Sequence, residues 1–375
     1  MNLLVINLDK AIFKKDSASL ARLKEYSRLV NKIFVIVWTN KKEKAISHDG
    51  KLFILPTNSS FKPLYFIHTW LLARRILKEN EIDLIFTQDP FETGLAGWVI
   101  AKIYNLPLQL QVHTDFLSPY FFKESFINKW RVVLAKCLVK RASLLRVVSR
   151  RIKNSTMEKI KVPEIKIMEL PIYVDKEKIF KAPINSDLHK KYPQFDFIIL
   201  MASRFSKEKN IGMAIASMLE VVKKFPKAGL VIVGRGNEEK RLKQLASGSE
   251  NIVFEPWTKE IVSYYKTADL FVLTSNYEGF GLSVIEAMAS GCPVVMTDVG
   301  CAGEIVEDSK NGLIIPVNNP ASLSEAVIKM IRDSGLREKF KSAGLEIVKN
   351  LPGKEENLAS YKESWEKTIA MHNRE

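Results

Sequence analysis

The chain has 375 residues, of which 46% are hydrophobic, and its formal net charge is +15. This length suits two domains of middling size, each able to bury a core of its own. No apolar run reaches the roughly 18 residues of a transmembrane helix, and residues 1–6 lack the basic start and cleavage site of a signal peptide, so we expect a core strand there.

Apolar stretches alternate with helical stretches through the first half of the chain. This alternation predicts a parallel sheet with helices on both faces and right-handed crossovers. The expected strands are residues 3–8, 33–38, 52–55, 82–87, 108–112 and 144–148. The expected helices are residues 17–30, capped by Asp16 or Ser17, and residues 63–79, 93–104 and 125–142.

The alternation weakens over residues 172–194, a charged stretch that we interpret as a linker between domains. A second alternating set follows it. Its expected strands are residues 197–202, 230–233, 252–254, 270–274, 293–297 and 313–316. Its expected helices are residues 211–224, 238–246, 261–267 and 320–334, followed by a polar tail helix at 355–373. We therefore predict two doubly wound α/β domains facing a cleft, with ligands at the carboxyl ends of the strands.

A glycine-rich turn follows the apolar strand at residues 270–274. Gly279 and Gly281 lie in this turn, and Glu278 and Glu286 bracket it. A strand, a glycine-rich turn and a helix together present backbone N–H groups to an anion or a polar ligand. The alternative is an ordinary connection between a strand and a helix, in which glutamate serves as a helix former.

Three other strand ends carry candidate ligand-binding residues. Arg204 and Lys209 follow the strand at 197–202, where two cations near a helix start can hold a diphosphate or can simply be solvated. Gly234 begins a G-x-G turn that lacks the third glycine of the dinucleotide fingerprint. Trp257 follows the strand at 252–254, where it can pack against a nucleobase or only against the protein.

Together these segments resemble glycosyltransferase family 4, the group 1 glycosyltransferases, which are retaining, nucleotide-sugar-dependent enzymes with the GT-B fold. The resemblance implies two Rossmann-like domains: an acceptor-binding domain at residues 1–180 and a nucleotide-sugar-binding domain at 181–354. It also implies that a C-terminal helix at 355–375 crosses back to the first domain. The motifs that carry the resemblance, in order, are Ser203–Lys209, Val231–Gly236, Ala268–Leu273 and Glu278–Val295.

The resemblance also implies a role for each matching residue. Arg204 and Lys209 would hold the donor diphosphate and stabilise charge on the leaving nucleotide. Glu278 would contact the donor sugar, and Glu286 would accept hydrogen bonds from the ribose hydroxyls. Sugar hydroxyls and phosphate would contact the backbone N–H groups of Gly279, Phe280, Gly281 and Leu282. Gly234 and Trp257 would lie beside the nucleotide.

The first domain matches the family more loosely. His113 and Asp115 follow the strand at 108–112, where family members often carry a histidine near the reacting centre. His113 would hydrogen-bond the donor sugar or orient the acceptor, with Asp115 in support. The glycine pair that family members often carry after the first strand is absent, and we expect Ser17 and the helix that it caps to substitute on the acceptor side.

The helix expected at 125–142 concentrates part of the positive charge. It combines an apolar stripe that includes Trp130 with Lys129, Lys136 and Lys140. Such a helix can lie on an anionic membrane. It can equally pack its stripe on the sheet and leave the lysines solvated, and the sequence leaves both interpretations open.

We expect a metal-independent, retaining transfer without a cofactor, because no Asp-x-Asp triplet occurs and cations with helix dipoles must then hold the diphosphate. The donor would be a UDP- or GDP-sugar. The acceptor would be a hydroxyl of a glycan or a lipid-linked molecule in the synthesis of cell-surface polysaccharide or glycolipid. The 3 cysteines form no Cys-x-x-Cys pair, which favours the cytoplasm, with peripheral binding at the inner face of the plasma membrane.

Two alternatives remain at this stage. A nucleotide-sugar epimerase or a sugar phosphorylase can use a similar two-domain scaffold. A nucleic-acid-binding protein would account for the charge of +15, but the sequence contains no recognised nucleic-acid-binding module, so we expect no nucleic-acid partner.

Overall fold

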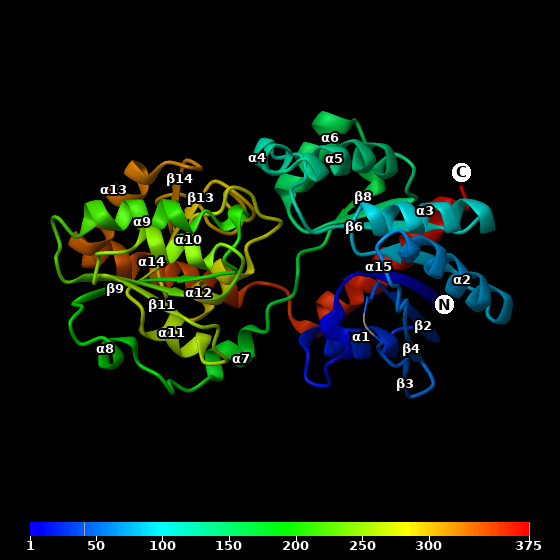
Figure 1. Cartoon of the computed structure of the whole chain (residues 1–375), viewed down its shortest axis with the longest axis horizontal. Coiled ribbons are helices and arrows are strands. Elements are labelled where there is room, and N and C mark those ends of the chain that lie inside the picture. Colours follow the sequence, from blue (N-terminus) through cyan, green and yellow to red (C-terminus); the bar gives the residue numbers. More distant parts are fainter. Residues whose placement is uncertain (41, 375) are drawn as a thin grey trace. The chain divides into compact units, whose positions relative to one another are not determined.

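The structure is a computed structural model that describes residues 1–40 and 42–374. The chain forms two compact units, each built around one parallel sheet (Figure 1). The first unit contains Met1–Leu117, Ser125–Pro171 and the C-terminal segment from Gly353. The second contains Ser118–Glu124 and Ile172–Pro352. Two parallel α/β sheets confirm the predicted fold class.

The first unit has an eight-stranded sheet in the order β3-β4-β2-β1-β5-β6-β7-β8. All neighbouring strands are parallel except the edge pair β3 and β4. The strands are β1 Asn2–Asn7, β2 Lys32–Val37, β3 Ile46–His48, β4 Leu52–Pro56, β5 Leu84–Thr87, β6 Leu108–Val112, β7 Leu144–Val147 and β8 Ile167–Glu169. The helices are η1 Lys10–Phe13, α1 Ala18–Arg28, α2 Leu64–Glu79, α3 Glu92–Tyr104, α5 Phe126–Val139, α6 Arg150–Ile160, η2 Glu164–Lys166 and α15 Lys354–His372.

The second unit has a six-stranded parallel sheet in the order β11-β10-β9-β12-β13-β14. Its strands are β9 Phe197–Ala202, β10 Ala228–Val233, β11 Ile252–Glu255, β12 Leu270–Leu273, β13 Val294–Thr297 and β14 Leu313–Ile315. Its helices are α4 Pro119–Glu124, α7 Lys176–Lys181, α8 Leu188–Lys191, η3 Lys207–Lys209, α9 Ile211–Val221, α10 Glu239–Leu245, α11 Ile261–Thr267, α12 Leu282–Ala289, α13 Pro320–Arg332 and α14 Ser334–Lys349.

Several elements differ from the sequence prediction. The first sheet has two strands that the sequence did not predict. β8 follows β7 and the unpredicted helix α6, and β3 adds an antiparallel strand at the other edge. The stretch at 172–194 contains the short helices α7 and α8, and α14 follows α13. These elements were missed because they are short or strongly polar: α6 buries only Ile152, Thr156 and Ile160 along a basic helix.

The C-terminal helix α15 completes the core of the first unit. Its Leu358, Tyr361 and Trp365 are buried in one cluster with residues of α1, β1 and β2, and in Figure 1 this red helix lies among the blue elements. The Trp365 ring stacks on Phe86 at 6.0 Å and meets Tyr26 edge-on at 5.6 Å. The predicted crossing of the C-terminal helix back to the first domain is therefore confirmed; residue 375, the last of the predicted helix, lies outside the described residues.

Within residues 1–40 and 42–374, each helix is too short or too polar to span a lipid bilayer.

Replacing Trp365 by alanine tests how much α15 contributes to stability. Trp365 is fully buried, so we expect Trp365→Ala to lower the free energy of unfolding by about 3–5 kcal/mol. Urea denaturation followed by circular dichroism measures this loss. Trp130→Ala is the matched control, because Trp130 is 63% exposed and its loss should cost about 0.5 kcal/mol or less. Equal losses in the two variants would show that α15 is not part of the core.

Candidate functional site

Two loops at the carboxyl edge of the second sheet form the candidate site. We call residues 203–210, which follow β9, the β9 loop, and residues 274–281, which follow β12, the β12 loop. β9 and β12 are parallel neighbours, so their loops emerge side by side. The hydroxyl of Thr274 donates to the carbonyl of Lys209 at 2.8 Å, and the amide of Asn276 donates to the carbonyl of Glu208 at 2.7 Å. The loops are thus joined by backbone contacts.

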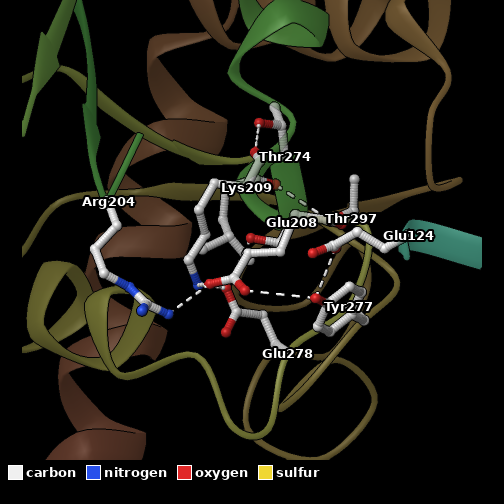
Figure 2. A network of polar contacts seen from close by, with 10 residues as sticks. Glu124, Arg204, Glu208, Lys209, Thr274, Tyr277, Glu278 and Thr297 are labelled. Atoms are coloured by element: carbon white, nitrogen blue, oxygen red, sulfur yellow. Dashed lines mark hydrogen bonds and ion pairs between the residues drawn. The ribbon is translucent and has the colours of Figure 1, made fainter. Parts of the chain in front are cut away.

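A chain of charged side chains also links the loops (Figure 2). Lys209 Nζ lies 2.6 Å from Glu278 Oε1, which also accepts a hydrogen bond from Ser275 Oγ at 2.7 Å. Arg204 lies 2.6 Å from Glu208 Oε1, and the same oxygen is 3.6 Å from Lys209. The structure therefore brings together Arg204, Lys209 and Glu278 through a fourth residue, Glu208.

The two ion pairs differ in solvent exposure. The side chains of Lys209 and Glu278 are only 14% and 12% exposed, whereas Arg204 is 77% exposed. Exposed ion pairs contribute little because water screens them, while mostly buried pairs hold each partner in place. Lys209 is therefore a fixed cation of the site, and Arg204 is a cation that can reorient.

Sequence reasoning missed Glu208 and Tyr277. The Tyr277 hydroxyl donates to Glu124 Oε2 at 2.7 Å and lies 3.5 Å from Glu208 Oε2. Burial, followed by the hydrogen bond to Glu124, raises the pKa of Tyr277 well above its usual range. Figure 2 shows Glu124 reaching Tyr277 from α4. The sequence signal for Glu208 was its position between Lys207 and Lys209; Glu124 had none, because its contact joins distant segments.

The β12 loop exposes backbone donors where α12 begins. Within the described part of the chain, no protein group accepts a hydrogen bond from the amides of Gly279, Phe280, Gly281 and Leu282. Gly281 has φ +96°, a conformation that favours glycine. Consecutive free amides at a helix start form a binding surface for anions and for hydroxyl groups.

Glu286 lies within α12, behind this row of amides. Its Oε2 accepts a hydrogen bond from the Tyr265 hydroxyl at 3.4 Å. Burial raises the pKa of Glu286 above its usual value near 4.5, and the hydrogen bond from Tyr265 partly offsets that rise. The carboxyl oxygens of Glu286 can accept hydrogen bonds from ligand hydroxyls.

Gly234 and Gly236 allow the turn after β10 to pack on the β9 loop. A Cβ atom at Gly234 would lie 1.9 Å from the carbonyl oxygen of Ser203, and one at Gly236 would lie 2.3 Å from that of Phe205. The hydroxyls of Ser203 and Ser206 are buried there without a hydrogen-bond partner among the described residues. Sequence reasoning missed both serines, which can donate to a bound ligand.

Trp257 follows β11 and is 58% exposed. Its neighbour Glu255 is held by Lys191 and by the hydroxyl of Tyr192. An exposed indole is available for stacking.

His113 follows β6 in the first unit. Its Nε2 lies 2.9 Å from Gln111 Oε1 and 3.4 Å from Arg146. Burial, then the charges of Arg146 and Arg22, hold the pKa of His113 well below its usual value near 6.5. Asp115 lies two residues further along the same loop. His113 is therefore a neutral imidazole.

The loop after β1 is closed by a carboxylate where family members often have glycines. Asp9 accepts hydrogen bonds from the amide of Ala11 at 2.9 Å and from the hydroxyl of Ser19. Ser17 is the N-cap of α1, since its Oγ accepts from the amide of Leu20 at 3.2 Å. The helix start is thus formed as predicted, and the Ser17 hydroxyl is already used as an acceptor there.

The apolar stripe of α5 faces outward. The interpretation that the stripe packs on the sheet is wrong for Phe126, Ile127, Trp130 and Val133, because α5 packs inward through other residues. Lys129, Lys136 and Lys140 are exposed beside the stripe. The exposed apolar side chains are Phe126 (71%), Ile127 (58%), Trp130 (63%) and Val133 (59%). The side chains that α5 buries are Asn128, Val132, Ala135, Leu138 and Val139.

Both units match models of known protein families. Residues 186–346 match the model of glycosyl transferases group 1, and residues 26–178 match that of glycosyltransferase family 4. The chain therefore belongs to glycosyltransferase family 4, as its motifs predicted. It is a glycosyltransferase of a retaining family, transfers a sugar from a nucleotide sugar, and has the GT-B fold.

Individual relatives share about a quarter of the sequence. The chain is 25% identical to phosphatidyl-myo-inositol mannosyltransferase of Mycobacterium leprae, over 80% of this chain and 78% of that protein. It is 23% identical to alpha-monoglucosyldiacylglycerol synthase of Acholeplasma laidlawii, over 80% and 81%. Among solved structures it resembles Anabaena HepE in complex with UDP-glucose, with a TM-score of 0.74, 20% identity and 99% of both chains covered.

Replacing Gly300, which packs against the β12 loop, tests whether close packing shapes that loop. A Cβ atom at Gly300, where φ is +55°, would lie 2.5 Å from the carbonyl oxygen of Phe280. We expect Gly300→Ala to lower the free energy of unfolding by about 1–2 kcal/mol for the backbone conformation and by a further 1–3 kcal/mol, roughly, for the clash. Gly303→Ala is the matched control, because Gly303 also has positive φ (+75°) but no atom within 4 Å of the added carbon. Equal losses in urea denaturation would contradict the packing argument.

Proposed function

We propose that this enzyme transfers a sugar from a UDP-sugar or GDP-sugar to a hydroxyl of a lipid-linked acceptor or a glycan, without a metal ion. The observation that carries the donor side is the row of free amides at residues 279–282 beside the mostly buried Lys209. Diphosphate needs donors and sugar hydroxyls need acceptors. The two loops present both kinds of group within one short segment of the sheet edge.

In this proposal Lys209 and Arg204 bind the diphosphate and stabilise the negative charge that develops on the leaving nucleotide. Glu208 and Glu278 already hold these cations at 2.6 Å, so the diphosphate shares them with carboxylates. This sharing favours a ligand with two phosphates over one with a single phosphate, because more negative charge competes better for the cations.

The sugar and the nucleoside bind further along the same loops. Glu278 accepts from a hydroxyl of the donor sugar, and Glu286 accepts from the ribose. Gly234 allows close approach of the backbone, and Trp257 stacks on the base. Binding of UDP-glucose by HepE, which has the same fold, supports a UDP-sugar as the first donor to test. His113 binds a substrate hydroxyl, with Asp115 beside it and the α1 start near Ser17 on the acceptor side.

Removing the buried cation tests the donor site. We expect UDP to raise the melting temperature of the wild type more than GDP or ADP does, since a ligand at 100 times its Kd adds about 2.7 kcal/mol of stability. In Lys209→Met the shift should vanish and turnover should fall by at least about 100-fold, because a charge-assisted hydrogen bond of roughly 1.5–3 kcal/mol is lost at each phosphate contact. Glu286→Gln should weaken UDP binding by about tenfold.

Lys243→Met on α10 is the control for this experiment, because among the described residues Lys243 pairs with Glu239 of the same helix. This variant should bind UDP like the wild type. Turnover by Lys209→Met at the wild-type rate, in protein with an unchanged melting temperature, would refute the assignment of the donor site.

The acceptor side is inferred from α5. An exposed row of four large apolar side chains beside three exposed lysines favours an anionic membrane surface, each lysine contributing about 1 kcal/mol. Two relatives are named for products or acceptors that are lipids. We infer a membrane-embedded lipid acceptor, with α5 lying on the lipid surface while the reaction occurs.

Vesicle flotation tests this inference. We expect the wild type to float with vesicles of phosphatidylglycerol and phosphatidylcholine, and far less with phosphatidylcholine alone or in high salt. Replacing Lys129, Lys136 and Lys140 by glutamine should weaken binding by about 100-fold, and Trp130→Ser should weaken it further.

The matched controls lie on α10, where Lys240 and Lys243 can be replaced by glutamine and the exposed Leu245 by serine. These variants should float like the wild type. If the α5 variants float as well as the α10 variants do, α5 is not the membrane-binding helix.

A further inference from the structure

Arg146 on β7 is fully buried, yet it has no carboxylate partner among the described residues. Its Nη2 donates to the carbonyl of Leu170 at 2.6 Å and lies 3.4 Å from that of Pro171. Its guanidinium carbon lies 4.8 Å from the centre of the Tyr361 ring. Burial of a cation without a counter-ion costs free energy, so the contacts that Arg146 makes must explain its position.

The remaining contacts of Arg146 are with Gln111 and, at the longer distance of 3.4 Å, with His113 itself. Arg146 Nη1 lies 3.2 Å from Gln111 Oε1, and that oxygen lies 2.9 Å from His113 Nε2. Gln111 projects from β6 and is itself buried. The three side chains form a short relay that begins at a donor-only group and ends at an imidazole.

The chemistry of arginine determines which groups donate and which accept hydrogen bonds in this relay. A guanidinium has only donors, so Gln111 must turn its carbonyl oxygen, and not its NH2 group, towards Arg146. The same oxygen lies 2.9 Å from His113 Nε2, whereas Arg146 Nη1 lies 3.4 Å from that nitrogen. The shorter contact is the stronger hydrogen bond, so Nε2 carries a proton and donates it to Gln111. A neutral imidazole has one protonated nitrogen, so Nδ1 carries the lone pair. This assignment depends on the donor-only guanidinium and not on an observed hydrogen.

The charges around His113 also favour the neutral imidazole. The charged groups that act on His113 are Arg146 on β7 and Arg22 on α1, and together with burial they keep the pKa of the imidazole low. A second proton on the ring is therefore disfavoured. Within the described residues, Nδ1 makes no hydrogen bond to the protein.

We propose that Arg146 and Gln111 are positioning residues for the transfer reaction: they hold His113 in the tautomer with its proton on Nε2, so that Nδ1 is offered as an acceptor to a sugar hydroxyl. The proposal rests on the role proposed above for His113. It explains the buried, unpaired Arg146 as the group that orients Gln111, since a neutral side chain at this position would leave the direction of the amide undetermined.

Gln111→Glu tests the relay with little change of shape. The carboxylate keeps its contacts to Arg146 and His113 but adds a negative charge beside the ring, so we expect the pKa of His113 to rise by one unit or more, roughly. Nuclear magnetic resonance titration of protein labelled at its 5 histidines, assigned with His113→Gln, measures this pKa and the tautomer. The wild type should show His113 neutral and protonated on Nε2 throughout the neutral range.

Activity provides the second readout. In Gln111→Glu the acid limb of kcat/KM should move to higher pH by the same shift as the His113 titration, because the ring must be neutral to accept a hydroxyl proton. Asn154→Asp is the control for added charge, since Asn154 lies on the exposed side of α6 in the same unit. It should leave both the titration of His113 and the pH profile unchanged.

Three results would overturn the proposal: a wild-type His113 that titrates near 6.5, a proton on Nδ1, or a Gln111→Glu titration identical to that of the wild type. Failure of the proposed function is distinguishable from these. If His113→Ala transfers sugar at the wild-type rate, the role of His113 fails, whereas the titration still reports whether the relay exists.

Discussion

The candidate site of the second unit depends on the pairing of β9 with β12. These strands are neighbours in a parallel sheet although β10, β11 and their connections separate them in the chain. Because parallel neighbours end at the same edge, the pairing places the β9 loop against the β12 loop. Only then can Lys209 meet Glu278, and only then can the Thr274 hydroxyl reach the Lys209 carbonyl. The cations, the carboxylates and the free amides all occupy one edge for this topological reason.

In the first unit, α15 has a comparable role. It covers the sheet face near β1 and β2 with Trp365 and Tyr361, and Gln109 of β6 donates to Thr368 at 2.8 Å. Tyr361 also lies against the Arg146 guanidinium. The last helix of the chain therefore packs against the residue that orients Gln111 and, through it, His113. The helix α15 therefore contributes both to the stability of the first unit and to the geometry around His113.

Much of the fold could be predicted because the signals are local. Alternating apolar strands and helices indicated both sheets, and the glycines and charges after strands marked the edge that carries the candidate site. The errors are also explained by physics. α6 carries a narrow buried stripe within a basic sequence, and β3 is a three-residue antiparallel edge, so neither has a periodicity strong enough to predict. Glu124 contacts Tyr277 from a segment that is distant in sequence, which no local pattern reveals.

The sequence by itself determined the family, through motifs in a fixed order, and the two-domain α/β class, through its periodicity. It also showed which strand ends carry the glycines and charged residues of the candidate site, because these depend on residue type at turns. Tertiary structure alone decided which face of α5 is covered: an apolar stripe indicates that a face can be buried, but the neighbours that bury it come from elsewhere in the chain. It also decided that Glu208 bridges Arg204 and Lys209, and that Arg146 has carbonyl and amide oxygens as partners in place of a carboxylate. Partners of buried charges are chosen by long-range packing, so their identity and direction appear only when the sheet is assembled.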